Sequence, residues 1–309
     1  YFNKYIYNIQ ANATISASSG FSSRLINTDE TFEWKGLEIT AEVSPIKNEN
    51  LQWNVIANWS KSHRYYKKLD PVYSPDNPWV KEGGRTDLYL YRDWERDPSG
   101  NLINYSGFPQ RSRYNSLMGT ADPDWVWGLS NVLNYGQFTF SLSFDGRVGG
   151  LSYSSTNARL YQTGAHPDLD NQYRYEEVVN DNLTFVGPGV KVVSGDVTYD
   201  NYGNIVEDSR VFETNDQIVS FESYYKGYGT GSQNIFDETF LKLREVSIAY
   251  QLPISLASKI KARTASVALT GQNLFIWTKE YRFSDPDKAS DDLNSPSIRY
   301  TGLNLKLTF

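Results

Sequence analysis

The chain has 309 residues, with 30 Lys and Arg against 36 Asp and Glu, so its formal net charge is −6. This acidic balance argues against a nucleic-acid-binding protein, which would present a basic face. The chain has no Cys and only two His, His63 and His166, which excludes disulfides, thiolate metal sites, cysteine nucleophiles and multi-histidine metal sites.

Hydrophobic residues make up 39% of the chain, while aromatic residues reach 15%. Few aliphatic and many aromatic side chains favour thin sheets with rings of Trp and Tyr over a thick aliphatic core. No apolar run approaches the roughly 18 residues of a membrane helix.

Strict alternation of apolar and polar residues is the dominant pattern along the chain, and helical periodicity is nearly absent. In the segment 37–44, Leu37 and Ile39 alternate with Glu38 and Thr40. The pattern predicts about eight strands, at residues 3–16, 32–45, 50–61, 124–135, 137–147, 240–252, 264–277 and 299–309. Most of these strands exceed the usual globular length of about 5–6 residues. They suit a tilted membrane-spanning strand of about 9–11 residues.

The connections alternate between short and long, which predicts a membrane barrel. Short connections lie at 46–49, at 136 and at 253–263. The longer ones lie at 17–31, 62–123, 148–239 and 278–298. If every strand crosses a membrane, all long loops fall on one side, as in outer-membrane barrels. The fold class is therefore predicted as all-β, an antiparallel transmembrane β-barrel. The alternative is a soluble sheet with one solvated face.

The polar face of the predicted strands indicates a wet lumen. Glu38, Glu42, Asn304 and Lys306 lie in mid-strand opposite apolar neighbours and are predicted to face the lumen. A group of aromatic residues lies at or near the strand ends, where the aromatic girdles of membrane barrels lie. These are Trp34, Trp53, Trp59, Trp125, Trp127, Tyr135, Tyr250 and Trp277.

Several segments resemble the C-terminal end of the SusC/RagA family, the TonB-linked outer-membrane receptors of Bacteroidetes. The most specific are Phe240-Leu-Lys-Leu-Arg-Glu-Val-Ser-Ile-Ala-Tyr-Gln-Leu-Pro253 and Thr270-Gly-Gln-Asn-Leu-Phe275, followed by a last strand that ends in Phe309. Segments 35–45 and 138–147 match in style. The resemblance covers most of the strands, whereas the loops match nothing comparable.

The resemblance implies a barrel of about 22 strands with an N-terminal plug, located in the outer membrane. It also implies nutrient import: TonB pulls on the plug, a SusD-like surface lipoprotein closes the outer mouth, and the pair takes up oligosaccharides or, in some members, peptides. Residues 1–309 are then the C-terminal portion of the barrel, with long extracellular loops at about 62–123 and 148–239. The plug and the N-terminal strands are expected to be missing from these residues and to be supplied by the same polypeptide or by a bound second chain. The implied partners are therefore the lipoprotein, TonB, the remaining strands, the ligand and the lipid bilayer.

Two sets of site residues follow. Phe309 ends the apolar face of the last strand, and the resemblance implies that it is a signal for the outer-membrane insertion machinery. In the loop 62–123, Trp79, Tyr91 and Trp94 are predicted to contact ligand, because sugars stack their C–H faces on aromatic rings. The alternative is that these rings pack the loop against itself or against the lipoprotein.

The remaining motifs predict neither catalysis nor metal binding. The acidic clusters at 285–292 and 166–170 lack EF-hand spacing and are interpreted as solvated loop charge. No nucleophile elbow, zinc-protease motif or phosphate loop is present in the sequence. We therefore predict a non-enzyme without cofactor or metal. The alternatives from other classes are a stand-alone small barrel acting as an adhesin or structural protein, and a soluble β-sandwich that binds glycans.

Overall fold

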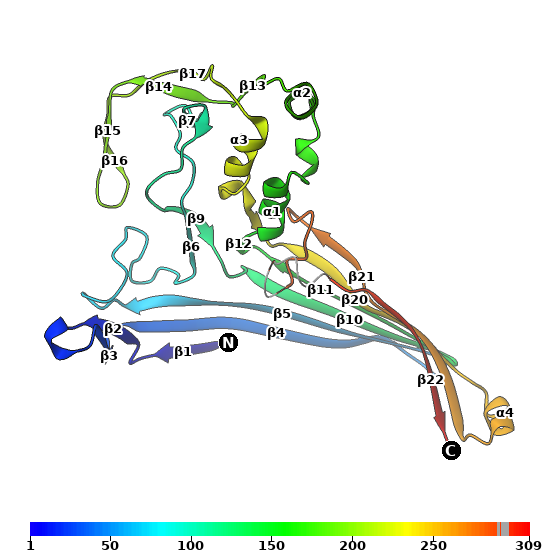
Figure 1. The fold of residues 1–309 in the computed structure, drawn as a ribbon. Coiled ribbons are helices and arrows are strands. Elements are labelled where there is room, and N and C mark those ends of the chain that lie inside the picture. Colours follow the sequence, from blue (N-terminus) through cyan, green and yellow to red (C-terminus); the bar gives the residue numbers. More distant parts are fainter. Residues whose placement is uncertain (289–290, 292–296) are drawn as a thin grey trace.

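The computed structural model describes residues 1–288, 291 and 297–309. Its main feature is one antiparallel sheet of eight strands in the order β1-β4-β5-β10-β11-β20-β21-β22 (Figure 1). The strands are β1 Phe2–Ile6, β4 Thr31–Lys47, β5 Leu51–Lys68, β10 Trp125–Tyr135, β11 Phe138–Val148, β20 Phe240–Gln251, β21 Thr264–Thr278 and β22 Tyr300–Thr308. Each strand pairs with the next one along the sheet, so the predicted antiparallel architecture is confirmed.

The first predicted strand is the one that differs from the structure. Strand β1 ends at Ile6, and Asn8 takes a positive φ of 57° that turns the chain out of the sheet. The predicted second half forms β2 (Gln10–Thr14), which pairs with β3 (Ser23–Asn27) in a separate hairpin. The single strand 3–16 was therefore wrong, because asparagine tolerates the left-handed conformation and interrupts an otherwise alternating pattern.

Connections of unequal length lie at opposite ends of the sheet (Figure 1). The short turns follow β4, β10 and β20, while the long loops follow β1, β5, β11 and β21. Among the described residues, β1 and β22 occupy the two outer edges and do not pair with each other, so the sheet is open. The short-turn end carries α4 (Ile254–Ala257) and the C-terminus.

The long loops carry their own secondary structure above the other end of the sheet (Figure 1). Their strands are β6 Leu88–Tyr91, β7 Ile103–Tyr105, β8 Phe108–Pro109, β9 Ser116–Thr120, β12 Leu151–Tyr153, β13 Phe185–Val186, β14 Val190–Ser194, β15 Val197–Tyr199, β16 Ile205–Asp208, β17 Val211–Thr214, β18 Ile218–Val219 and β19 Ile235–Asp237. Their helices are α1 Ser155–Thr163, α2 Gln172–Asn180 and α3 Phe221–Tyr228. None of the helices in the described parts of the chain has the length and apolar character needed to cross a membrane.

These three helices were not predicted, because each is too short to show a long amphipathic pattern. Their ends are marked in the sequence by capping residues alone. Ser154 caps α1 by accepting a hydrogen bond from the Asn157 amide, and Gly164 ends it at a φ of 75°. Ser220 caps α3 in the same way. A serine followed by glycine ten residues later is the local signal that could have found α1.

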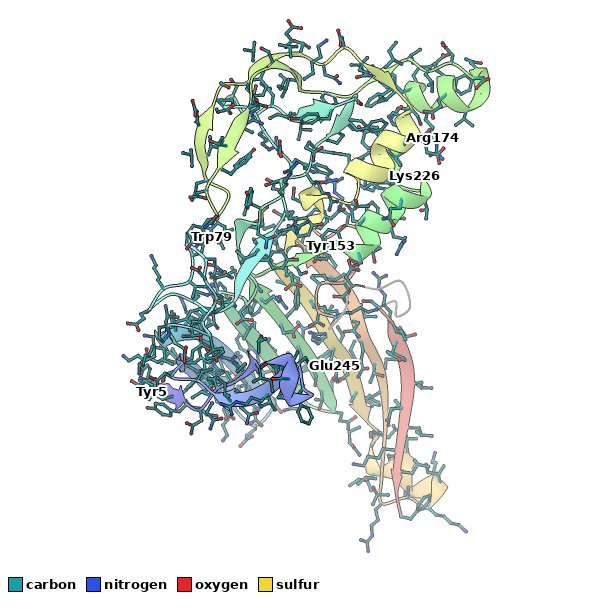
Figure 2. All side chains as sticks on the ribbon, turned by 60° about the vertical axis from the view of Figure 1, so that its left-hand side comes forward. Tyr5, Trp79, Tyr153, Arg174, Lys226 and Glu245 are labelled. Carbon is teal, nitrogen blue, oxygen red and sulfur yellow. The ribbon has the colours of Figure 1, made fainter. Side chains whose placement is uncertain are left out.

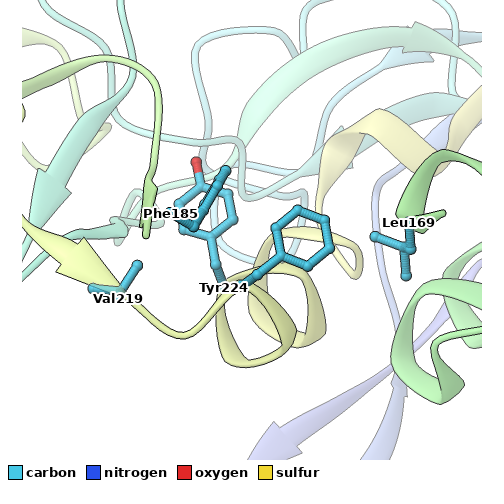
Figure 3. Close-up of a cluster of buried hydrophobic side chains, with 5 residues drawn as sticks. Leu169, Phe185, Val219 and Tyr224 are labelled. Carbon is cyan, nitrogen blue, oxygen red and sulfur yellow. The ribbon is translucent and has the colours of Figure 1, made fainter. Parts of the chain in front are cut away.

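The buried apolar cluster lies in these loops and not in the sheet. It consists of Leu169, Phe185, Val219, Phe221 and Tyr224 (Figure 3). Phe185 and Phe221 meet edge to face with ring centroids 5.1 Å apart. The loop region is therefore a packed unit with an aromatic core that holds the surfaces above the sheet in place.

Candidate functional site

One face of the main sheet is predominantly polar, with Ile56, Val126 and Val132 among its apolar residues. Antiparallel partners share a face, and the register pairs Glu38 with Ser60 and Asn304 with Ala268. Cross-strand hydrogen bonds on this face join Thr40 Oγ1 to Asn58 Oδ1 at 2.9 Å and Ser130 to Ser143 at 3.1 Å. Followed strand by strand, the register places all four residues predicted to line a lumen, Glu38, Glu42, Asn304 and Lys306, on this same face.

The opposite face is apolar and exposed. Leu303 is 72% exposed and its partner Leu269 is 62% exposed, although both lie within paired strands. The same face carries the predicted aromatic residues in two tiers. Trp59, Trp125, Trp127 and Trp277 lie toward the long loops, and Trp53, Tyr135 and Tyr250 lie toward the short turns.

Trp34 is the exception to the predicted girdle. Trp34 and Glu38 are four residues apart in β4, so their side chains lie on the same face of the sheet. The Trp34 ring contacts Phe2, with 5.9 Å between the ring centroids. Arg64, its cross-strand partner, lies 5.8 Å from the Trp34 ring. Trp34 therefore belongs to the polar face, where cation–π contact holds it.

An ionic cluster, which we call the latch, ties the loop after β21 to the polar face. Lys242 Nζ contacts Asp285 Oδ2 at 2.6 Å and Asp287 Oδ2 at 3.1 Å. Arg244 bridges Asp287 Oδ2 at 2.6 Å and Asp145 Oδ1 at 2.7 Å. Burial raises the pKa of Asp287, but the hydrogen bonds from Arg244 and Lys242 outweigh it and hold that pKa below its ordinary value.

The latch corrects the interpretation of the acidic segment 285–292 as solvated charge. Asp285 is 7% exposed and Lys242 is 5% exposed. Within that segment, residues 289, 290 and 292 lie outside the described residues. In the other acidic cluster, Asp168 is exposed as expected, whereas His166 is buried.

The segment after β21, which carries the latch acids, also helps to line two clefts. The first, of about 460 Å³, opens on the polar face and is lined in part by Glu38, Arg147 and Asp287. The second, of about 770 Å³, lies between α1 and the segment after β21, and His166 and Tyr161 form part of its wall. Their rings stack at 3.9 Å, and His166 Nδ1 accepts a hydrogen bond from the Asp168 amide. Burial lowers the pKa of His166, which favours the neutral ring.

The three aromatic residues predicted to contact ligand have different surroundings. Trp94 is 6% exposed, stacks on Tyr228 and donates from Nε1 to Gln233 Oε1 at 3.0 Å. Tyr91 stacks on Tyr153 and donates its hydroxyl to the Thr230 carbonyl at 3.1 Å. Trp79 is half-buried, lines a third cleft, and has no ring stacked on it within the described residues. Ligand contact stays a prediction for all three, and at Trp94 it requires the ring to be uncovered.

The three clefts are lined by aromatic, amide and charged side chains. Within the described residues, no group of three or more His, Asp or Glu side chains is placed to hold a metal ion. The latch, Gln233 and the cleft walls were missed by the sequence analysis. Their partners lie far apart in the chain. One signal for the latch exists in the sequence: Lys242 and Arg244 are two residues apart, and so are Asp285 and Asp287.

No family model matches the chain. Two curated relatives from Formosa agariphila do: TonB-dependent receptor P3 is 24% identical over 93% of this chain, and TonB-dependent receptor P26 is 22% identical over 100% of it. The chain spans 28% and 32% of their lengths, respectively.

The fold is similar to that of solved structures of the RagAB peptide importer. In the "open-open" state the TM-score is 0.64, with 15% identity over 99% of this chain and 32% of that one. In the "closed-closed" state the TM-score is 0.62, with 16% identity over 99% and 33%. The resemblance predicted from residues 240–253 and 270–275 is confirmed, and the open sheet is that of a β-barrel wall seen in part.

Proposed function

We propose that residues 1–309 form the C-terminal portion of the barrel of a TonB-dependent outer-membrane transporter. The observation that carries the proposal is the main sheet with one exposed apolar face and one polar face. A contiguous apolar surface of this extent needs an apolar environment, and a lipid bilayer supplies it. Two tiers of aromatic rings on the apolar face fit the two membrane interfaces.

In this proposal the long loops, including about 62–123 and 148–239, are extracellular, and Glu38, Glu42, Asn304 and Lys306 face the lumen. Phe309, at 73% exposure beside Leu307, serves as the assembly signal. The strands that pair with β1 and β22, and the plug on which TonB acts, lie outside these residues. Unpaired strand edges in lipid would otherwise cost several kcal/mol per backbone group.

The transporter imports oligosaccharides or peptides together with a SusD-like surface lipoprotein that covers the loop region. The names of the relatives and structural neighbours, receptors and an importer, support transport and not catalysis. The chain's own share is passive: it supplies lumen wall, loop contacts and the assembly signal.

The two alternative functions fit the structure less well. A stand-alone barrel of eight strands requires β1 to pair with β22, and in the described residues they lie at opposite edges. A soluble β-sandwich requires a second sheet over the apolar face, which is exposed in the described part of the chain.

The native protein extracted from outer membranes should have an intact denatured mass of about three times the 35.3 kDa of these residues, judged from the share of the relatives that they span. Uptake of its nutrient should stop in cells that lack TonB. A native mass near 35.3 kDa without a plug-bearing partner would contradict the proposal. Uptake that continues without TonB would contradict it as well.

A further inference from the structure

A cleft of about 350 Å³ lies where the tip of the β15–β16 hairpin meets the start of the loop after β5. Figure 2 shows Trp79 beside this tip. The cleft shares no lining residue with the latch or with the other two clefts. Besides Trp79, its wall includes Arg92, Arg113, Tyr114 and Tyr202.

The walls of the cleft are held in place by contacts between distant segments. The Tyr202 hydroxyl donates to Asp76 Oδ1 at 2.9 Å, which ties the hairpin tip to the loop below. Tyr114 packs so closely on Gly203 that a Cβ added there would lie 2.4 Å from the Tyr114 Cβ. The binding surface is therefore formed before any ligand arrives, which lowers the entropic cost of binding.

Two guanidinium groups in the cleft are available to a ligand. Arg92 and Arg113 are both exposed, and neither forms an ion pair within the described residues. Arg113 acts electrostatically on Glu95, but the ion pair of Glu95 is with Arg210, whose Nη1 lies 3.7 Å away. By contrast, Arg85 is satisfied by Asp87 at 2.6 Å.

We propose that this cleft binds an acidic saccharide. The sugar ring stacks on Trp79, and its carboxylate or sulfate accepts hydrogen bonds from Arg92 and Arg113. The side-chain amides of Asn115 and Asn201 in the wall are available to hydroxyl groups, whereas Asn77 Oδ1 already accepts hydrogen bonds from the Trp79 and Val80 amides. This inference deepens the proposed import of oligosaccharides and rests on it. A flat aromatic platform beside amides favours a sugar over an acidic peptide.

The test is calorimetric titration of the full receptor, purified in detergent, with oligogalacturonate. Its methyl ester has the same rings without the charge and is the matched ligand control. We expect the acid to bind at least about tenfold more tightly than the ester, because two charge-assisted hydrogen bonds are involved. A sulfated galactose oligosaccharide in the same assay shows which anion the arginines prefer.

Variants locate the binding to the cleft. Arg92→Gln with Arg113→Gln should remove the preference for the acid, and Trp79→Ala should weaken both ligands. Arg96→Gln is the matched control, since Arg96 donates to the Gly100 carbonyl and does not line the cleft. Unchanged heat-modifiable mobility on gels checks that each variant barrel is folded.

Equal binding of acid and ester, or tighter binding of oligoglutamate than of either sugar, would overturn the inference. So would a preference that survives the double arginine substitution. These outcomes leave the proposed transport function intact, because that function fails only through the mass and TonB-dependence measurements.

Discussion

Replacing Lys242 by Met should lower the free energy needed to open the segment 279–288 away from the polar face by about 3–5 kcal/mol. A buried ion pair that loses one partner leaves an uncompensated charge. Met keeps the aliphatic stem of the side chain and removes only the ammonium group. Asp285 and Asp287, at 2.6 Å and 3.1 Å from Lys242 Nζ, would then lack that partner. Hydrogen exchange of the 279–288 amides in the full receptor measures the opening.

Lys279 provides the matched control. It lies on the same loop and contacts Asp237 at 2.6 Å, but its side chain is 51% exposed. Lys279→Met should therefore leave local opening almost unchanged, because an exposed ion pair contributes little to stability. Adding Asp285→Asn to Lys242→Met should restore part of the protection. Equal exchange in the two lysine variants would contradict the latch.

Replacing Leu269 by Arg should destabilise the folded receptor by about 1–3 kcal/mol in lipid vesicles, the cost of a cation on the lipid face between the short-turn interface and mid-bilayer. Leu269 lies in β21 on the apolar face, opposite Ile248 on one side and Leu303 on the other. Its neighbour Ala268 faces the other way, between Ala249 and Asn304. Ala268→Arg should stay within about 0.5 kcal/mol, as for an ordinary solvated position.

Urea unfolding of the receptor in vesicles compares these two variants directly. Both substitutions add the same side chain to the same strand, so differences in strand propensity largely cancel. An Ala268→Arg cost equal to or above that of Leu269→Arg would reject the assignment of faces.

The wall could be predicted from the sequence because its information is local. Alternation in segments such as 37–44 specifies both the strand and its faces, and the turn lengths specify the order. The bulge in β20 shows the limit of this reasoning. Perfect alternation would place Lys242 and Val246 on one face, and the register shift between Leu243 and Glu245 separates them.

The loop site could not be predicted in the same way. Trp94 and Gln233 meet although they are 139 residues apart, and Lys242 meets Asp285 across 43 residues. No periodic pattern encodes such contacts. The aromatic composition of the loop therefore looked like ligand-binding surface, whereas two of its three selected rings pack against other loops.

In a barrel wall, one face of the sheet contacts lipid and the other contacts water. These 309 residues contain no Cys, so a single cysteine introduced at Leu269 or Ala268 is the one thiol in this part of the receptor. Labelling by a water-soluble maleimide in native membranes should modify Ala268→Cys and spare Leu269→Cys, because the reactive thiolate does not form in lipid, whereas both should be modified once the receptor is unfolded. Efficient aqueous labelling of Leu269→Cys in intact membranes would contradict the barrel-wall account.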